Sequence, residues 1–200
     1  MAITNGYCTR ANLTDQLRIT DNIDDNVLDR AINAASRQID GRCGRRFYLD
    51  GSATARTYAP QNAGLVIIDD VSTLTALVVK SDTGLDSTFA TTLTIGTDFQ
   101  VEPLNGLVQG NPITQLRSLD ANYYVQADSR ATVQVTAKWG WPSVPVAITE
   151  ATALLAARIF KRYDSPLGVA GFGDLGAITV RRLDPDVEQL IAPYRLFGLI

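Results

Sequence analysis

The side chains that most often carry catalysis are scarce in this sequence. Its 200 residues contain no histidine and only two cysteines, Cys8 and Cys43, which are far apart along the chain. Without histidine, the usual Ser-His-Asp triads and zinc sites are excluded. The hydroxyl nucleophiles lack an adjacent base, and no pair of acids is placed for glycoside chemistry. We therefore expect no enzyme activity, no catalytic residue, no cofactor and no metal site.

One short motif matches a nucleotide-binding pattern. Residues 171–176 read GFGDLG, which fits G-x-G-x-x-G letter for letter. The dinucleotide fingerprint requires a strand before it and a helix directly after it, because the helix N-terminus holds the pyrophosphate. Here a helix and a loop come first and a short strand is expected to follow. The sequence favours a loop that becomes ordered on binding over a phosphate site.

Two acidic clusters resemble cation sites only superficially. Asp21, Asp24 and Asp25 lack the alternating ligands, the glycine and the distant glutamate of a calcium-binding EF-hand loop, and helix capping explains them more simply. Asp69-Asp70 could bind a cation, but a solvated strand end is the favoured interpretation.

Basic and aromatic clusters each allow two interpretations. Arg42, Arg45 and Arg46 could contact DNA phosphates, although complementing a helix dipole and forming salt bridges is favoured. Trp139 and Trp141 could stack on a ligand, but aromatic residues at a strand end are more often core anchors. The pair at 181–182, both arginine, could bind carboxylates of a partner.

Composition bounds the class of protein. The net charge is −3 and the pI is near 4.9, which argues against a broad basic surface that grips nucleic acid but allows DNA to slide past. The apolar fraction of 46% is ordinary for a globular protein. We expect no signal peptide, no membrane span and a reducing, cytosolic origin with both thiols buried or idle.

The candidate residues depend on the elements that hold them, and the central one is a helix from Asp24 towards Tyr48. Leu28, Ile32, Ala35 and Ile39 form one apolar stripe on it. Asp24 is expected to cap its start and the glycines at 41 and 44 to end it. A shorter helix beginning at Thr9 precedes it, so that the two form a helical hairpin.

After this helical hairpin, the sequence pattern becomes that of β structure. Strands are expected at 65–68 and 73–80 and around 89–95, with a hairpin over 98–108 about Asn105-Gly106. Strict alternation over 132–139 predicts the clearest strand of the chain. Together they predict an antiparallel β lobe of about five or six strands.

Helical periodicity returns at Pro145, where a further helix is expected to begin. Its apolar stripe consists of Ile148, Ala151, Leu155 and Ile159. Because Leu154 and Phe160 flank this stripe, we expect the helix to be covered on more than one side, partly by a neighbouring subunit. A glycine-rich loop over 164–176, a short strand over 177–183 and a last helix from Asp184-Pro185-Asp186 to Pro193 should follow.

These elements predict an α+β protein: a helical bundle built from the N- and C-terminal helices, with an inserted antiparallel β lobe. The expected domains are a helical hairpin over 1–48, the β lobe over 49–140, a core helix over 141–163 that completes the bundle, and a glycine loop with a C-terminal segment over 164–200.

The helical half resembles a known family. The stretches 7–17 and 39–48, then Trp139-Gly140-Trp141-Pro142, Lys161-Arg162, 164–166 and 184–195, are similar in order and spacing to the head–tail connector proteins of tailed phages, the gp6-like adaptor family. The resemblance covers roughly half of the chain and leaves the β lobe unmatched.

The resemblance implies a non-enzymatic ring in the virion neck. Such a ring, of twelve subunits, would sit below the portal, receive the next neck or tail component, and let double-stranded DNA pass through its lumen without reading sequence. It would assemble in the host cytoplasm, without a membrane. Because the family's C-terminal segment reaches the portal, the implied portal contacts are six residues of this segment: Phe172, Arg181, Arg182, Tyr194, Arg195 and Phe197.

Two other functions remain open. One is a different neck or tail completion protein, such as a stopper or a terminator. The other is a small-ligand-binding or hydrolytic protein that uses the β lobe. If the adaptor interpretation holds, deleting 177–200 is expected to leave the fold largely intact and to abolish portal docking.

Overall fold

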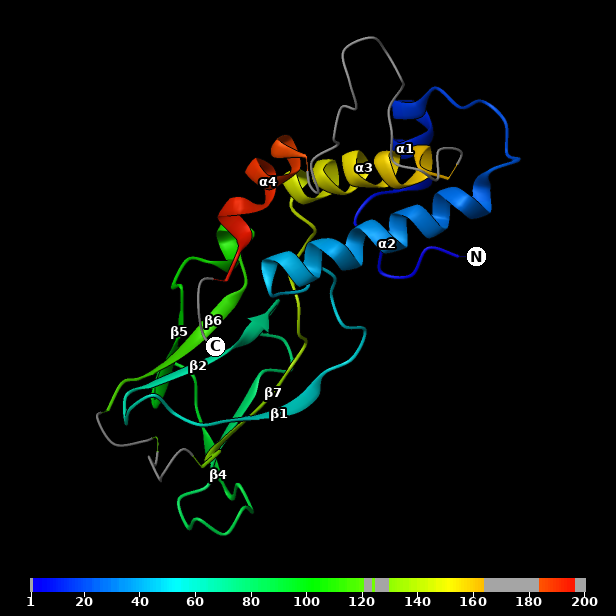
Figure 1. Cartoon of the computed structure of the whole chain (residues 1–200). Coiled ribbons are helices and arrows are strands. Elements are labelled where there is room, and N and C mark those ends of the chain that lie inside the picture. Colours follow the sequence, from blue (N-terminus) through cyan, green and yellow to red (C-terminus); the bar gives the residue numbers. More distant parts are fainter. Residues whose placement is uncertain (1, 121–123, 125–129, 164–183, 197–200) are drawn as a thin grey trace. The chain divides into compact units, whose positions relative to one another are not determined.

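A computed structural model describes residues 2–120, 124, 130–163 and 184–196 of the chain (Figure 1). The chain divides into two compact units: Met1–Tyr48 with Val144–Ile200, which is helical, and Leu49–Ser143, which is built of strands. The predicted α+β class, with an antiparallel β lobe inserted between helical ends, is confirmed. Within the described residues, no helix has both the length and the apolarity needed to cross a bilayer.

The N-terminal hairpin forms because its ends are well specified. Helix α1 (Arg10–Leu17) begins at Thr9, which forms a capping box with Asn12. Helix α2 (Asp25–Cys43) runs past Gly41 and ends where Gly44 adopts the left-handed conformation. Asp24 stands at the N-cap position, but its side chain makes no capping hydrogen bond, so that part of the prediction is wrong.

The predicted stripe of α2 is confirmed. Leu28, Ile32, Ala35 and Ile39 are all fully buried. Asp29 of α2 is also buried, and it pairs with Arg10 of α1.

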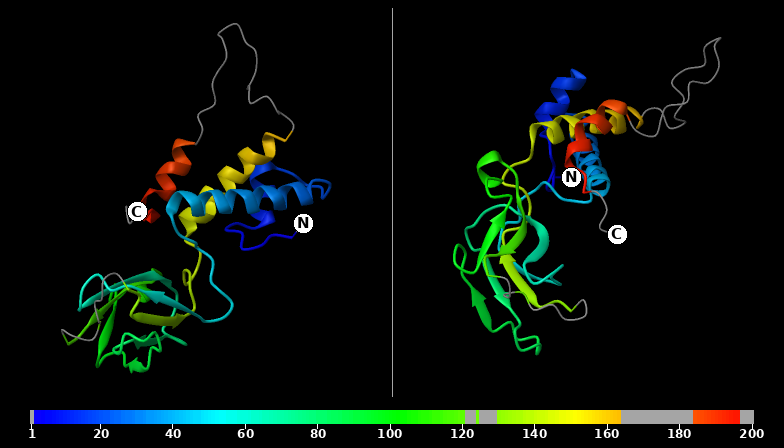
Figure 2. Two further views of the ribbon diagram at one scale, coloured as in Figure 1. Left: turned by 60° about the horizontal axis from the view of Figure 1, so that its bottom comes forward. Right: turned by 90° about the vertical axis from the view of Figure 1, so that its left-hand side faces the viewer.

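The C-terminal helices complete the bundle. Helix α3 (Val146–Lys161) follows Pro145, lies beside both α2 and α4 (Pro185–Ile191), and also contacts α1 (Figure 2). The alanines at 153, 156 and 157 are buried, which lets neighbouring helices approach closely. Asp184 caps α4 as predicted, and the turn η2 (Ala192–Tyr194) follows. The predicted loop over 164–176 and strand over 177–183 lie outside the described residues.

The β unit consists of two antiparallel sheets. One has the strand order β1-β7-β3-β4 and the other β2-β6-β5. The strands are β1 (Thr54–Tyr58), β2 (Leu65–Val71), β3 (Val78–Ser81), β4 (Thr91–Leu93), β5 (Phe99–Glu102), β6 (Ile113–Ser118) and β7 (Val133–Ala137). An isolated bridge between Val71 and Trp139 links the two sheets. A shared core of Val66, Val79, Phe99, Leu116, Val135 and Trp139 lies inside.

Two expectations for the β unit are wrong for identifiable reasons. The strand expected over 73–80 is only β3, because residues 74–77 turn and Ala76 has a positive φ of 64°. The hairpin over 98–108 does not form: Gly106 is right-handed and leads into the turn η1 (Leu107–Gln109). Strand β5 instead pairs with β6, which was not predicted.

Candidate interaction site at the end of α2

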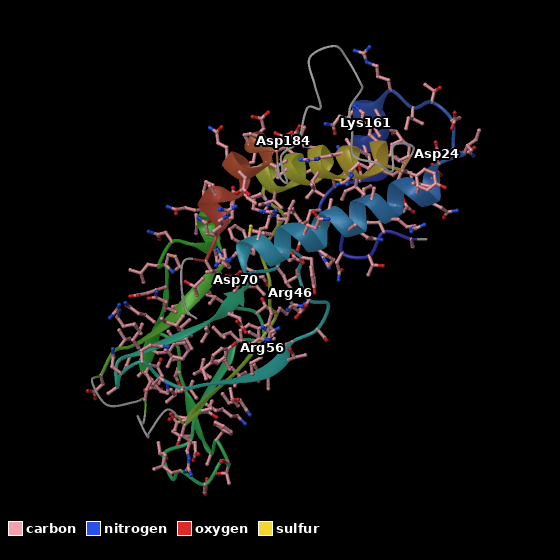
Figure 3. All side chains as sticks on the ribbon, viewed as in Figure 1. Asp24, Arg46, Arg56, Asp70, Lys161 and Asp184 are labelled. Atoms are coloured by element: carbon pink, nitrogen blue, oxygen red, sulfur yellow. The ribbon has the colours of Figure 1, made fainter. Side chains whose placement is uncertain are left out.

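The carboxylates that could hold a cation serve the fold instead. Asp69 forms an ion pair with Arg56 at 2.6 Å and accepts a hydrogen bond from the Tyr58 hydroxyl at 2.9 Å. Asp70 is buried and accepts the indole N–H of Trp141 at 3.0 Å, so it is not a solvated strand end (Figure 3). Among the described residues, no three side chains of the metal-binding types cluster together. Both tryptophans are buried anchors, as favoured from the sequence.

The two thiols are buried, as expected, and are not joined in a disulfide. Burial raises the pKa of Cys8 to about 11, with a smaller contribution from the charge of Glu150. Burial likewise raises the pKa of Cys43 to about 11. Because the thiolate is the nucleophilic form, neither cysteine is activated for chemistry near neutral pH.

The predicted portal contacts divide into two groups. Phe172, Arg181, Arg182 and Phe197 lie outside the described residues. Tyr194 and Arg195 are described, and both lie at the C-terminal end of α2. The Tyr194 ring meets Phe47 edge-on, with the ring centroids 5.8 Å apart. The neighbouring main chain is also attached, because the Leu196 N–H donates to the Cys43 carbonyl at 2.9 Å.

A carboxylate that sequence reasoning did not single out lies at the centre of this site. Glu188, on α4, binds the Arg42 guanidinium through Oε1 at 2.9 Å and the Arg195 guanidinium through Oε2. The three side chains are 35%, 37% and 31% exposed respectively, so the cluster is accessible from solvent. No local pattern could have identified it, because Arg42 and Glu188 are 146 positions apart.

Two arginines at the end of α2, Arg42 and Arg46, make contacts within the subunit. Arg46, labelled in Figure 3, donates to the Tyr48 hydroxyl at 2.5 Å and stacks 4.8 Å from the centre of its ring. With Arg42 paired to Glu188, this geometry favours the interpretation of dipole complement and salt bridges over DNA contact.

The N-terminal segment also contacts this end of α2, through Tyr7. The Tyr7 hydroxyl donates to Asp40 and accepts the Phe47 N–H at 2.9 Å. Burial raises the pKa of Asp40, opposed by the Tyr7 hydrogen bond and by the charges of Arg37 and Arg46. The Tyr7 and Phe47 rings also meet edge-on at 5.6 Å. Phe47 thus lies between two tyrosines, one from each end of the chain.

Two solved structures share this fold over the whole chain. One is the neck of an empty gene transfer agent particle computed with C6 symmetry, with 20% identity and a TM-score of 0.57 over 100% of this chain and 95% of that chain. The other is the virion of a native gene transfer agent particle, with 21% identity and a TM-score of 0.56 over the same shares. No protein-family model and no curated protein matches the sequence.

Proposed function

We propose that the chain is a structural head–tail adaptor of a phage-like particle, which forms a ring below the portal through which DNA passes. The observation that carries this proposal is the fold shared, end to end, with chains of a gene transfer agent neck and virion. The sequence resemblance to the gp6-like adaptors, which lies in the helical half, points independently to the same position in a particle.

The chemistry of the described residues is compatible with a structural part. The candidate nucleophiles are buried thiols with raised pKa values, and the paired carboxylates are engaged by arginine, tyrosine and tryptophan. A net charge of −3 suits a lumen past which DNA moves, because affinity for phosphates grows with the number of cations presented.

Ring formation needs one surface of a subunit to bind a different surface of the next. Both units expose large apolar side chains that such contacts would cover. On the helical unit these are Ile23 and Val146, and on the β unit Leu104 and Val108. The proposed ring of twelve is compatible with the sixfold symmetry applied to the neck of the gene transfer agent.

The C-terminal segment is the proposed portal contact, and Tyr194, Arg195 and Phe197 belong to it. Within this proposal, assembly takes place in the host cytoplasm and the mature location is the virion neck.

Native mass spectrometry of the purified protein, alone and mixed with portal rings of the same particle, tests the proposal. We expect complexes in which about twelve copies bind one portal ring. A protein that stays monomeric and never joins the portal would contradict it.

A second candidate is another neck component, such as a stopper or a tail terminator. It is favoured by the fact that the two similar structures are described only as a neck and a virion, which leaves the level within the neck open. Labelling the protein in intact particles for electron microscopy distinguishes the two, since an adaptor lies against the portal and a stopper or terminator lies away from it.

A further inference from the structure

The N-terminal residues lie along α2 as an irregular strap (Figure 1). We use this name for residues 2–7. Asn33 of α2 accepts the Thr4 N–H at 2.9 Å, and one turn further along the Arg37 guanidinium donates to the Asn5 carbonyl at 2.9 Å. Both hydrogen bonds are open to solvent. The first part of the strap is therefore fastened to α2 through its main chain, by contacts that can open without disturbing the core.

The second part of the strap is packed closely against α2. A Cβ added to Gly6 would lie 3.0 Å from Cγ2 of Ile32 and would clash with Ile3, so a larger residue fits only if its neighbours shift. Tyr7 follows, is 3% exposed, and donates its N–H to the Ser36 hydroxyl at 3.1 Å. The strap thus delivers the Tyr7 side chain to a fixed place on α2.

Tyr7 connects the strap to the residues that follow α2. Its hydroxyl accepts the Phe47 N–H at 2.9 Å, and the two rings meet edge-on. The Arg37 guanidinium, which also binds the strap, lies 5.5 Å from the centre of the Tyr7 ring and 5.1 Å from that of Tyr48. Residues 45–48, which we call the exit segment, lead from the end of α2 to the β unit.

The exit segment is neither helix nor strand, so its order depends on tertiary contacts such as these. We propose that the strap is a latch on the connection between the helical unit and the β unit. While the strap is docked, Tyr7 and Arg37 hold the exit segment. Lifting residues 2–5 off α2 would loosen Tyr7 from Phe47, so the state of the N-terminus and the freedom of this connection are linked.

This inference goes beyond the proposed adaptor function and does not depend on it. It predicts that a partner which captures residues 2–5 releases the exit segment without touching it. Portal binding tests the adaptor function separately, and either proposal can fail without the other.

Loosening the strap far from the exit segment tests the latch. Asn33→Ala removes a side chain whose two hydrogen bonds both go to the strap. We expect the Phe47 amide to exchange its hydrogen roughly three- to tenfold faster than in wild type, measured by NMR at neutral pH. Trypsin should cleave after Arg45 and Arg46 faster by a similar factor. Gln38→Ala, at an exposed position of the same helix, is the matched control and should match wild type in both measurements.

A second variant leaves α2 unchanged. Thr4→Pro removes the strap N–H that binds Asn33, and it should accelerate exchange and cleavage in the same way. It carries the comparison if Asn33→Ala alters the helicity of α2.

Exchange in the middle of α2 separates a latch from a general loss of stability. The amides of Ile32 and Ala35 should exchange in both variants as they do in wild type. Acceleration of these amides by the same factor as Phe47 would overturn the inference, because the strap would then be one part of a single cooperative core. An exit segment that exchanges and is cleaved at wild-type rates in both variants would overturn it as well.

Discussion

At the scale of residues, the helical unit depends on polar groups that are buried with their partners. Asp29 is 2% exposed and accepts hydrogen bonds from Arg10 Nε at 2.8 Å and Nη2 at 2.7 Å. Tyr7 is equally enclosed and connects Asp40 to the main chain of Phe47. A buried polar group that loses its partner costs more than the partner contributed, so these positions are sensitive to substitution.

Replacing Arg10 by alanine should reduce stability in a pH-dependent way. The hydrogen bonds from Arg10 hold the pKa of Asp29 below its ordinary value. A carboxyl with a lowered pKa in the folded state contributes stability above its unfolded pKa of about 3.9, and that contribution is lost as the pH falls. Urea denaturation should therefore show a clear deficit of Arg10→Ala at neutral pH that shrinks towards pH of about 3.

The matched control is Arg30→Ala, which removes an exposed arginine from α2. It should show no comparable deficit at either pH. A deficit of Arg10→Ala that is the same at neutral and acidic pH would contradict the role given to the Asp29 pair.

Replacing Tyr7 by phenylalanine removes one hydroxyl, which the half-buried Asp40 carboxylate and the buried Phe47 N–H both use. We expect a loss of about 1–3 kcal/mol in the free energy of unfolding, measured by urea denaturation. Tyr163→Phe makes the same chemical change at a side chain that is 66% exposed and should be nearly neutral. Equal effects of the two substitutions would show that the buried hydroxyl contributes nothing.

At the scale of elements, α4 belongs to the core. Val187 and Ile191 are fully buried, and α4 packs against α3. Deleting 177–200 would remove this helix together with the segment that follows it, so we now expect the truncated protein to be destabilised. A deletion that tests docking should begin after Leu196.

Ile191→Ala should destabilise the helical unit by about 2–5 kcal/mol, because it opens a cavity where no solvent reaches. Val146→Ala shortens an aliphatic side chain that is largely exposed and should change the free energy of unfolding by less than about 0.5 kcal/mol. Circular dichroism at the helical band during urea denaturation measures both. A neutral Ile191→Ala would mean that α4 does not contribute to the core.

At the scale of the whole molecule, the chain consists of two units that each have a hydrophobic core. The core of the β unit includes Trp139, and both tryptophans of the sequence lie in that unit. The α-helices found among the described residues all lie in the other unit. Tryptophan fluorescence and helical circular dichroism consequently report on different parts of the chain.

Ile191→Ala should therefore shift the helical transition in urea while leaving the fluorescence transition nearly unchanged, if each unit unfolds as its own cooperative element. Phe99→Ala, in the core of the β unit, should do the reverse. Coincident shifts of both probes in both variants would show instead that the chain unfolds as one cooperative unit.

The fold could be predicted from the sequence wherever buried residues recur at regular intervals along a helix or a strand. The stripe of α2 and the alternation of β7 were both found from sequence, because one face of each element is buried and the other is not. Strand β1 was missed because none of its side chains is fully buried. Strand β6 was missed because its buried residues, Ile113 and Leu116, are three apart and break the alternation.

The candidate site was only partly predictable. Tyr194 and Arg195 were named from a family resemblance, which indicates a segment but not what each side chain touches. Glu188 was not identified, because its partner Arg42 lies at the other end of the chain and a half-exposed glutamate on a short helix carries no local signal.

By itself, the sequence determined the class of the protein: α+β, with an antiparallel β lobe inserted in the sequence between helical ends, and without any histidine. It could do so because periodicity, caps and composition are local properties of the chain. Only the tertiary structure decided that Asp29, Asp70 and Glu188 pair as they do and that α4 is core. Those pairings join residues far apart in sequence, and burial of a charge is decided by what folds over it.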